Sequence, residues 1–88
     1  MRYKVELTKD SIKGLRKLPR TASLRLAKLL DDIADKGVER FEYPNYSKLG
    51  DNRYHCHLGY GWVACWRWKD IMLVVEVYYV GSRESAPY

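Results

Sequence analysis

Polar and apolar residues alternate over residues 2–7, which is the period of a half-buried strand. Thr8 follows at the position of a helix N-cap, and a short helical pattern then runs to Pro19, which stops it. A longer helical stripe begins there and ends at Gly37, a residue typical of C-terminal caps. Its apolar members are Ala22, Leu26, Leu29, Leu30 and Ile33. Because the two helices are joined so tightly, we expect them to form a hairpin.

The second half of the chain predicts three strands after an irregular segment. Residues 38–52 show no clear period, and we expect an ordered loop anchored by aromatic side chains. Strand-like patterns follow over residues 53–58, 62–68 and 71–80, with turns at residues 59–61 and 69–70. The last strand is a nearly continuous β-branched run, so we expect it to be central and well buried.

These elements give the order β-α-α-β-β-β, an α+β fold. We expect a curved antiparallel sheet with the N-terminal helical hairpin packed on one face. The 88 residues make a single domain, 1–88, since two independent cores are not possible at this length. The helical stripe predicts that Leu26, Leu29, Leu30 and Ile33 are buried against a sheet whose middle includes Val75 and Val77.

The composition excludes several classes of protein. Hydrophobic residues at 47% and charged residues at 31% are typical of a globular domain. The longest apolar run is interrupted by Glu76 and is too short to span a membrane. The first residues lack the apolar stretch of a signal peptide, so we expect a cytoplasmic protein without a membrane partner. Cys56 and Cys65 match no Cys-pair zinc pattern, and we expect them to be reduced core residues.

Basic residues concentrate in the two expected helices. Between Lys9 and Lys28 the only acidic residue is Asp10, so this stretch carries a net charge of +6, against +5 for the whole chain. Its basic residues are Lys9, Lys13, Arg16, Lys17, Arg20, Arg25 and Lys28. Such a surface suits a polyanion, because each phosphate contact releases counterions. A solvated helix surface without a partner is the alternative interpretation.

The order of elements and several short motifs resemble the RelE/ParE toxin superfamily of bacterial and archaeal toxin–antitoxin systems. The matching segments are the helix break at 17–19, the K-L-G loop at 48–50, the strand at 54–59, the closing V-x-x-V-G-x-R over 77–83, and Tyr88. The resemblance covers essentially the whole chain. It implies a RelE-type toxin that enters the ribosomal A site, cleaves mRNA without a metal or other cofactor, and is held inactive by a cognate antitoxin.

Two other functions are compatible with the resemblance. ParE-type members share the fold but inhibit DNA gyrase, and a degenerate toxin would retain only antitoxin binding. The fold alone therefore does not decide the function, which depends on the residues of the site.

The resemblance also implies the site residues. RelE proper carries basic residues on the strand that corresponds to residues 53–58, and in this chain those positions hold His55 and His57. Its third-strand arginine is replaced by Trp62, and its late arginine and tyrosine correspond to Arg83 and Tyr88. We therefore expect His55, His57, Arg83 and Tyr88 to be catalytic. The expected RNA contacts are Lys9, Lys13, Arg16, Lys17, Arg20, Arg25, Lys28, Arg53 and Trp62.

The histidines favour this chemistry on their own. At i and i+2 of a strand they share one face, about 6.6 Å apart along the chain. With a reference pKa of about 6.5, one imidazole can accept a proton while the other donates one. One alternative is that both histidines are solvated and have no role. Another is a zinc-binding His-x-His pair, although it lacks an obvious third ligand.

The pairing register decides which residues accompany the histidines. If Leu58 lies opposite Val63, Cys56 and Cys65 pair and face the helices. The other face would then carry the histidines with Trp62, Trp66 and Trp68, an aromatic platform able to stack bases. A slip of one residue sends the tryptophans to the core instead. We expect Trp62 to face the substrate.

Overall fold

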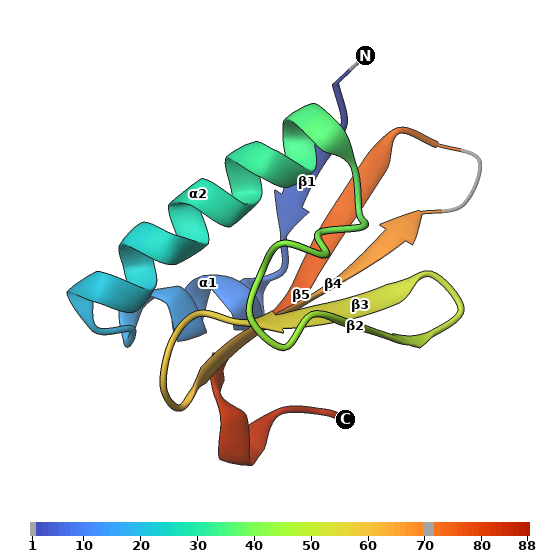
Figure 1. Cartoon of the computed structure of the whole chain (residues 1–88). Coiled ribbons are helices and arrows are strands. Elements are labelled where there is room, and N and C mark those ends of the chain that lie inside the picture. Colours follow the sequence, from blue (N-terminus) through green and yellow to red (C-terminus); the bar gives the residue numbers. More distant parts are fainter. Residues whose placement is uncertain (1, 70–71) are drawn as a thin grey trace.

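The computed structural model describes residues 2–69 and 72–88, in which two helices lie against one face of a five-stranded sheet (Figure 1). The elements in chain order are β1 (Lys4–Leu7), α1 (Lys9–Arg16), α2 (Arg20–Lys36), β2 (Ser47–Gly50), β3 (Arg53–His57), β4 (Trp62–Lys69), β5 (Val74–Ser82) and the 3-10 helix η1 (Arg83–Ser85). The α+β class and the helical hairpin on one face are therefore confirmed.

The sheet order is β1-β5-β4-β3-β2, and it differs from the expectation in two details. β1 runs parallel to β5, whereas the other neighbouring strands are antiparallel, so the sheet is mixed. Periodicity identifies a strand but carries no information on its direction. The segment expected to be an unbroken loop also contains β2, which pairs with β3 through a turn in which Asn52 has a φ of 58°. Asparagine tolerates this left-handed conformation better than most residues.

The last strand starts later than the sequence pattern indicates. β5 begins at Val74, and residues 72 and 73 form a turn before it. The expected strand start at Ile71 and the Asp70 position of the expected turn lie outside the described residues. β5 is still an inner strand, because β1 and β4 flank it on its two sides.

The core forms between α2 and the centre of the sheet. Leu26, Leu29 and Ile33 are at most 1% exposed, as are Val75 and Val77 of β5, so the predicted packing is confirmed. Leu30 packs against this cluster at its edge. Fully burying an aliphatic side chain of this size contributes about 1.5–3 kcal/mol. This layer fixes the hairpin on one face and leaves the opposite face of the sheet without a covering helix (Figure 1).

Local signals place the helix ends where the sequence predicts them. The Thr8 side chain accepts a hydrogen bond from the Ser11 amide and caps α1, and Gly37 follows α2 with a φ of 96°. α1 also approaches β5 very closely at Gly14, where an added Cβ would lie 1.7 Å from the carbonyl oxygen of Val80. Among the described residues, no helix is long and apolar enough to cross a membrane.

Candidate functional site

The β3–β4 hairpin has a register one residue away from the pairing of Leu58 with Val63, which is the second of the two registers considered from the sequence. His57 lies opposite Val63, and the Leu58 amide donates to the Trp62 carbonyl over 2.8 Å. A three-residue loop closes this hairpin, with φ values of 124° at Gly59 and 82° at Gly61. Glycine adopts these angles without strain. The loop of three residues is therefore possible here, and its length sets the register of the hairpin. Of the two registers left open by the sequence, the structure therefore has the one that differs by one residue from the pairing of Leu58 with Val63.

This register turns the tryptophans toward the helices. Trp66 is fully buried in the core and donates from its indole nitrogen to the Val38 carbonyl over 3.1 Å. Trp62 and Trp68 are half-buried and pack against the same cluster. The aromatic platform beside the histidines therefore does not form. The expectation that Trp62 faces a substrate on the histidine side of the sheet is wrong. Only the paired strands could decide this, because side chains of a strand change faces with each residue.

The cysteines lie on opposite faces of the sheet. Cys56 pairs with Ala64 and joins the helix-side core, whereas Cys65 lies opposite His55. The pairing of the two cysteines that the other register would give does not occur. Both thiols are free and buried, and burial raises the pKa of each to about 12. They are therefore thiols rather than nucleophilic thiolates near neutral pH.

The two histidines lie together on the face away from the helices. Their ring centroids are 5.7 Å apart, and His55 is only 7% exposed. The Ser47 hydroxyl lies 3.0 Å from Nδ1 of His55, because β2 places Ser47 directly opposite it. This contact engages Nδ1 and helps to fix the orientation of the ring. Sequence reasoning missed Ser47 because it did not find β2.

The C-terminal tail folds back toward the histidines. The Arg83 amide donates to the Gly61 carbonyl over 2.8 Å, and the Ser82 side chain caps the short helix η1. Beyond it, the Tyr88 ring lies 4.4 Å from the His55 ring, centroid to centroid. Arg83 is exposed, and it forms no ion pair with Glu84 in the described part of the chain. We call His55, His57, Arg83 and Tyr88 the histidine site.

Burial and charge hold both imidazoles neutral near pH 7. Desolvation lowers the pKa of His55, and His57 lowers it further, against a contact with Ser47 that raises it. Desolvation also lowers the pKa of His57, and the nearby positive charge of Arg83 adds to this effect. A neutral imidazole accepts a proton readily. A bound phosphate would favour the imidazolium form by its negative charge, so either histidine can become a donor once the site is occupied.

The expected RNA contacts divide between the two sides of the molecule. The seven expected basic contacts between Lys9 and Lys28 are all exposed. The helices lie on the face opposite the histidines, so these residues do not line the histidine site directly (Figure 1). Arg25 and Lys28 come nearest, because they line a cavity of about 330 Å³ that His57 borders. Arg25 also donates to the Leu58 carbonyl over 3.3 Å and so supports the β3–β4 loop. Arg53 is the one expected RNA contact on the histidine face.

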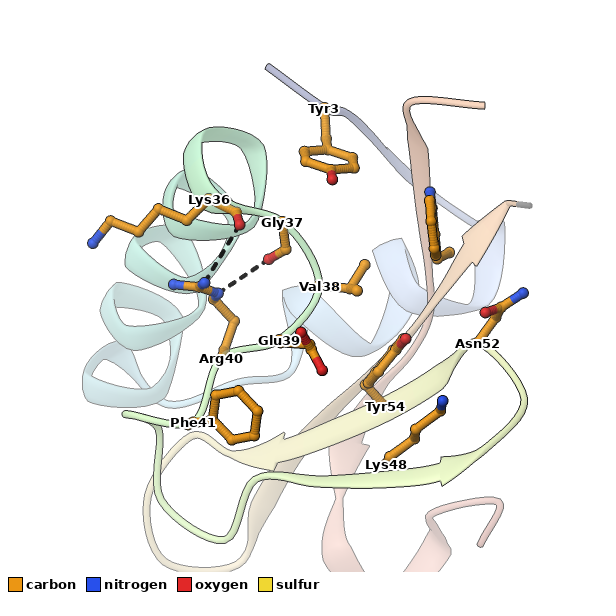
Figure 2. Close-up of a pocket in the computed structure, with 11 residues that line it drawn as sticks. Tyr3, Lys36, Gly37, Val38, Glu39, Arg40, Phe41, Lys48, Asn52 and Tyr54 are labelled. Atoms are coloured by element: carbon orange, nitrogen blue, oxygen red, sulfur yellow. Dashed lines mark hydrogen bonds between the residues drawn. The ribbon is translucent and has the colours of Figure 1, made fainter. Parts of the chain in front are cut away.

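A second cavity, of about 580 Å³, lies beside the C-terminal end of α2 (Figure 2). Tyr54, Phe41 and Trp68 are among its aromatic walls, and its lining contains neither a histidine nor a cysteine. Figure 2 shows Arg40 donating to the carbonyl oxygens of Gly37 and Lys36, over 3.0 and 3.5 Å, which satisfies the end of the helix. Arg40 therefore has a structural role here, and both histidines lie outside this cavity.

The histidine pair has no partner for a tetrahedral metal site in the described part of the chain. Residues 2–69 and 72–88 contain no group of three His, Cys, Asp or Glu side chains arranged to hold an ion. Structural zinc takes four protein ligands and catalytic zinc takes three. The chemistry that this arrangement supports is acid–base transfer between two imidazoles beside a guanidinium.

Comparison with known proteins identifies the fold. No family model matches the sequence, and no curated protein sequence matches it. Several solved structures match the fold of this chain. A chain of the archaeal RelE–RelB complex from Pyrococcus horikoshii OT3 aligns over 98% of this chain and 100% of its own, with 20% identity and a TM-score of 0.75. The protein has the RelE-like toxin fold.

Two further structures show the same RelE-like fold. A free mutant of the E. coli toxin RelE covers 98% of this chain and 88% of its own, with 23% identity and a TM-score of 0.76. A chain of the E. coli DinJ–YafQ toxin–antitoxin complex covers 100% of both, with 10% identity and a TM-score of 0.77. At these identities the shared property is the RelE-like fold, and the function has to be argued from the residues of the site.

Proposed function

We propose that the protein is the toxin of a type II toxin–antitoxin system and cleaves mRNA in the ribosomal A site, without a metal, to inhibit translation. The observation that carries this proposal is the histidine site, in which the two imidazole rings lie 5.7 Å apart, the Tyr88 ring lies 4.4 Å from His55, and the charge of Arg83 acts on His57. RNA cleavage by the neighbouring 2′-hydroxyl needs a base, an acid and a cation, and these groups supply all three.

The environments of the two histidines suggest their roles. His55 is the more buried and is held by Ser47, so it is the base that accepts the proton of the 2′-hydroxyl. The 2′-oxygen attacks phosphorus as the bond to the 5′-oxygen breaks. The bound phosphate favours the imidazolium form of His57, which takes its proton from solvent. His57 donates this proton to the leaving oxygen. The products are a 2′,3′-cyclic phosphate and a 5′-hydroxyl.

Arg83 and Tyr88 complete the site in this proposal. The guanidinium of Arg83 lies near His57 and stabilises the negative charge that develops on the phosphorane. The Tyr88 ring lies beside His55 and is half-exposed, so it is available to stack on a base next to the cleaved linkage. The basic helices bind ribosomal RNA from the other side of the molecule, because their exposed charges suit phosphate contacts.

A cognate antitoxin is the expected protein partner. Solved structures with this fold include RelE–RelB and DinJ–YafQ toxin–antitoxin complexes. Their similarity in fold to the whole of this chain supports a partner of the same kind here. A protein that stops translation requires such an inhibitor in the cell that makes it.

Two measurements test the proposed function. Ribosome-bound mRNA exposed to the purified protein should be cut to fragments with 2′,3′-cyclic phosphate and 5′-hydroxyl ends. Induction of the protein in cells should stop translation before any damage to DNA. DNA damage that precedes the loss of translation would instead support the ParE-like, gyrase-binding alternative, and antitoxin binding without either effect would support a degenerate toxin.

A further inference from the structure

Two arginines face each other across the sheet beside the histidine site. Arg53 of β3 is the direct cross-strand partner of Arg67 of β4, and both side chains are exposed. They share the face of His55, because Arg53 precedes it by two residues of the strand. Like charges directly opposite each other destabilise a sheet. A pair of this kind is therefore explained more readily by a bound anion than by folding.

The acidic groups nearby neutralise only part of this charge. Glu76 of β5 forms ion pairs with Nε of Arg67 over 3.2 Å and with Nζ of Lys69 over 3.5 Å, so one carboxylate neutralises part of the charge of two cations. Within residues 2–69 and 72–88, Arg53 has no carboxylate within 4 Å. The cluster of Arg53, Arg67, Lys69 and Glu76 thus carries a net charge of +2.

Tyr78 of β5 contacts one arginine of the pair. It occupies the irregular position of β5, where the register with β4 shifts, and the Arg67 guanidinium lies 4.4 Å from the centre of its ring. Its hydroxyl is buried and has no hydrogen-bond partner in the described part of the chain. Burial raises the pKa of Tyr78, and the positive charges of Arg53 and Arg67 act against this rise.

Gly50 leaves room for the second guanidinium. A Cβ at this position would lie 2.6 Å from Nη2 of Arg53, so the arginine occupies the space that a side chain on β2 would fill. The φ of Gly50 is not positive, and an alanine there would displace the end of Arg53 without straining the backbone. The chain therefore keeps a specific place for this guanidinium.

We propose that Arg53 and Arg67 form a subsite that binds a phosphate of the RNA next to the linkage that the histidines cleave. This inference rests on the proposed function. Arg53 lies about 7 Å along the strand from His55, which places the subsite beside the cleaved linkage rather than on it. Planar guanidinium groups bind phosphate oxygens in pairs, and these two arginines occupy directly opposite positions of neighbouring strands. Their role is to position the RNA, not to transfer a proton.

Binding of an uncleavable RNA tests the subsite without relying on cleavage. The probe is a short single-stranded RNA with 2′-O-methyl groups throughout, and its affinity is measured by fluorescence anisotropy at several salt concentrations. Arg53→Gln and Arg67→Gln should each weaken binding by about 10- to 150-fold, as expected for a charge-assisted hydrogen bond. Each should reduce the slope of log K against log salt by about 0.7, the value for one phosphate of a single strand.

Two further variants make the result specific. Gly50→Ala keeps both arginines but displaces Arg53, so it should reproduce the loss seen with Arg53→Gln. Arg2→Gln removes an exposed arginine that pairs with Asp35 over 2.9 Å on the far side of the sheet, and it should leave RNA binding unchanged. Because Arg67→Gln also frees Glu76, the Arg53 and Gly50 variants keep the test valid if that variant folds poorly.

A second experiment locates the phosphate. Single neutral methylphosphonate linkages are introduced near the cleaved position of ribosome-bound mRNA, and single-turnover rates are measured for the wild type and for Arg53→Gln. One neighbouring neutral linkage should slow the wild type but have little further effect on Arg53→Gln, since both changes remove the same interaction. At other linkages the two effects should multiply.

The possible outcomes separate the subsite from the proposed function. RNA binding that responds to Arg53 and Gly50 in a protein that does not cleave mRNA would support the subsite and refute the nuclease. Cleavage by the wild type, with the arginine variants matching Arg2→Gln in affinity and salt slope, would refute the subsite alone. Absence of RNA binding by the wild type would overturn the subsite, as would variants that weaken only antitoxin binding.

Discussion

The Ser47 hydroxyl lies 3.0 Å from Nδ1 of His55, and the two residues are direct partners in the β2–β3 register. A four-residue edge strand thus orients the more buried imidazole of the histidine site. In the proposed mechanism Nδ1–H of His55 donates to the Ser47 hydroxyl, and Nε2 accepts the proton of the 2′-hydroxyl. Ser47 is a positioning residue in the proposed mechanism.

Ser47→Ala should lower the cleavage rate by about 3- to 10-fold, the effect expected for one hydrogen bond. Ser47→Thr keeps the hydroxyl on a residue that suits a strand, so it should restore most of the rate. Single-turnover cleavage of ribosome-bound mRNA measures both. Equal rates for the alanine and threonine variants would show that the hydroxyl does not orient His55.

The pH dependence of cleavage should reflect both histidines. Because burial lowers the pKa of each in the free protein, kcat/KM should rise and then fall with its maximum below about pH 6.5. The maximum of kcat should lie at higher pH, since bound phosphate favours the charged form of His57.

Alanine at His55 or His57 should remove one limb of this profile and reduce the rate on the order of 10²–10⁴-fold. The double variant should be little slower than the poorer single variant, because groups that act as a unit are not additive. Profiles over about pH 5.5–9 check both points. Full activity of the double variant would exclude the histidine mechanism.

Replacement of Arg83 should affect both the rate and the pH profile. The positive charge of Arg83 lowers the pKa of His57, so Arg83→Ala should raise that pKa and move the corresponding limb to higher pH. The rate should also fall, because the phosphorane loses its cation. Arg83→Lys keeps the charge and should leave the limb in place, although it loses bidentate binding. An unshifted limb in the alanine variant would place Arg83 away from His57 in the working protein.

The exposed basic face of α1 should contribute to ribosome binding. Changing Lys13, Arg16 and Lys17 to Glu should weaken binding and flatten its salt dependence, by up to about one unit of slope for each phosphate that the protein no longer neutralises. Arg2→Glu, outside the helices, is the control for a general effect of charge. Binding is measured by sedimentation with ribosomes at several salt concentrations, and an unchanged slope would assign these residues to solubility or to the antitoxin.

Gly14 should be required for the packing of α1 on β5. Alanine normally favours a helix over glycine by about 1 kcal/mol. At this position its Cβ would collide with the backbone of Val80, so Gly14→Ala should instead destabilise the protein by about 1–3 kcal/mol, as overpacking does. Lys13→Ala on the exposed face of the same helix is the control. Urea unfolding measures both, and a stabilised Gly14→Ala variant would contradict the close approach.

The sequence by itself determined the elements whose signals are local. The period of the Leu26–Ile33 stripe placed α2 on the sheet, Thr8 and Gly37 marked helix ends, and the β-branched run predicted the buried β5. The i, i+2 spacing of His55 and His57 also required that they share a face. Each of these follows from interactions within a few residues or from one amphipathic pattern.

Only the tertiary structure decided how the strands meet. The Gly59–Gly61 loop set a register that sent Trp62 and Trp66 to the helix side, and no periodic pattern distinguishes two registers that differ by one residue. The parallel direction of β1 and the pairing that brings Ser47 to His55 depend on residues far apart in the chain. The cross-strand partnership of Arg53 and Arg67 has the same origin, because pairing between strands is a property of the folded sheet.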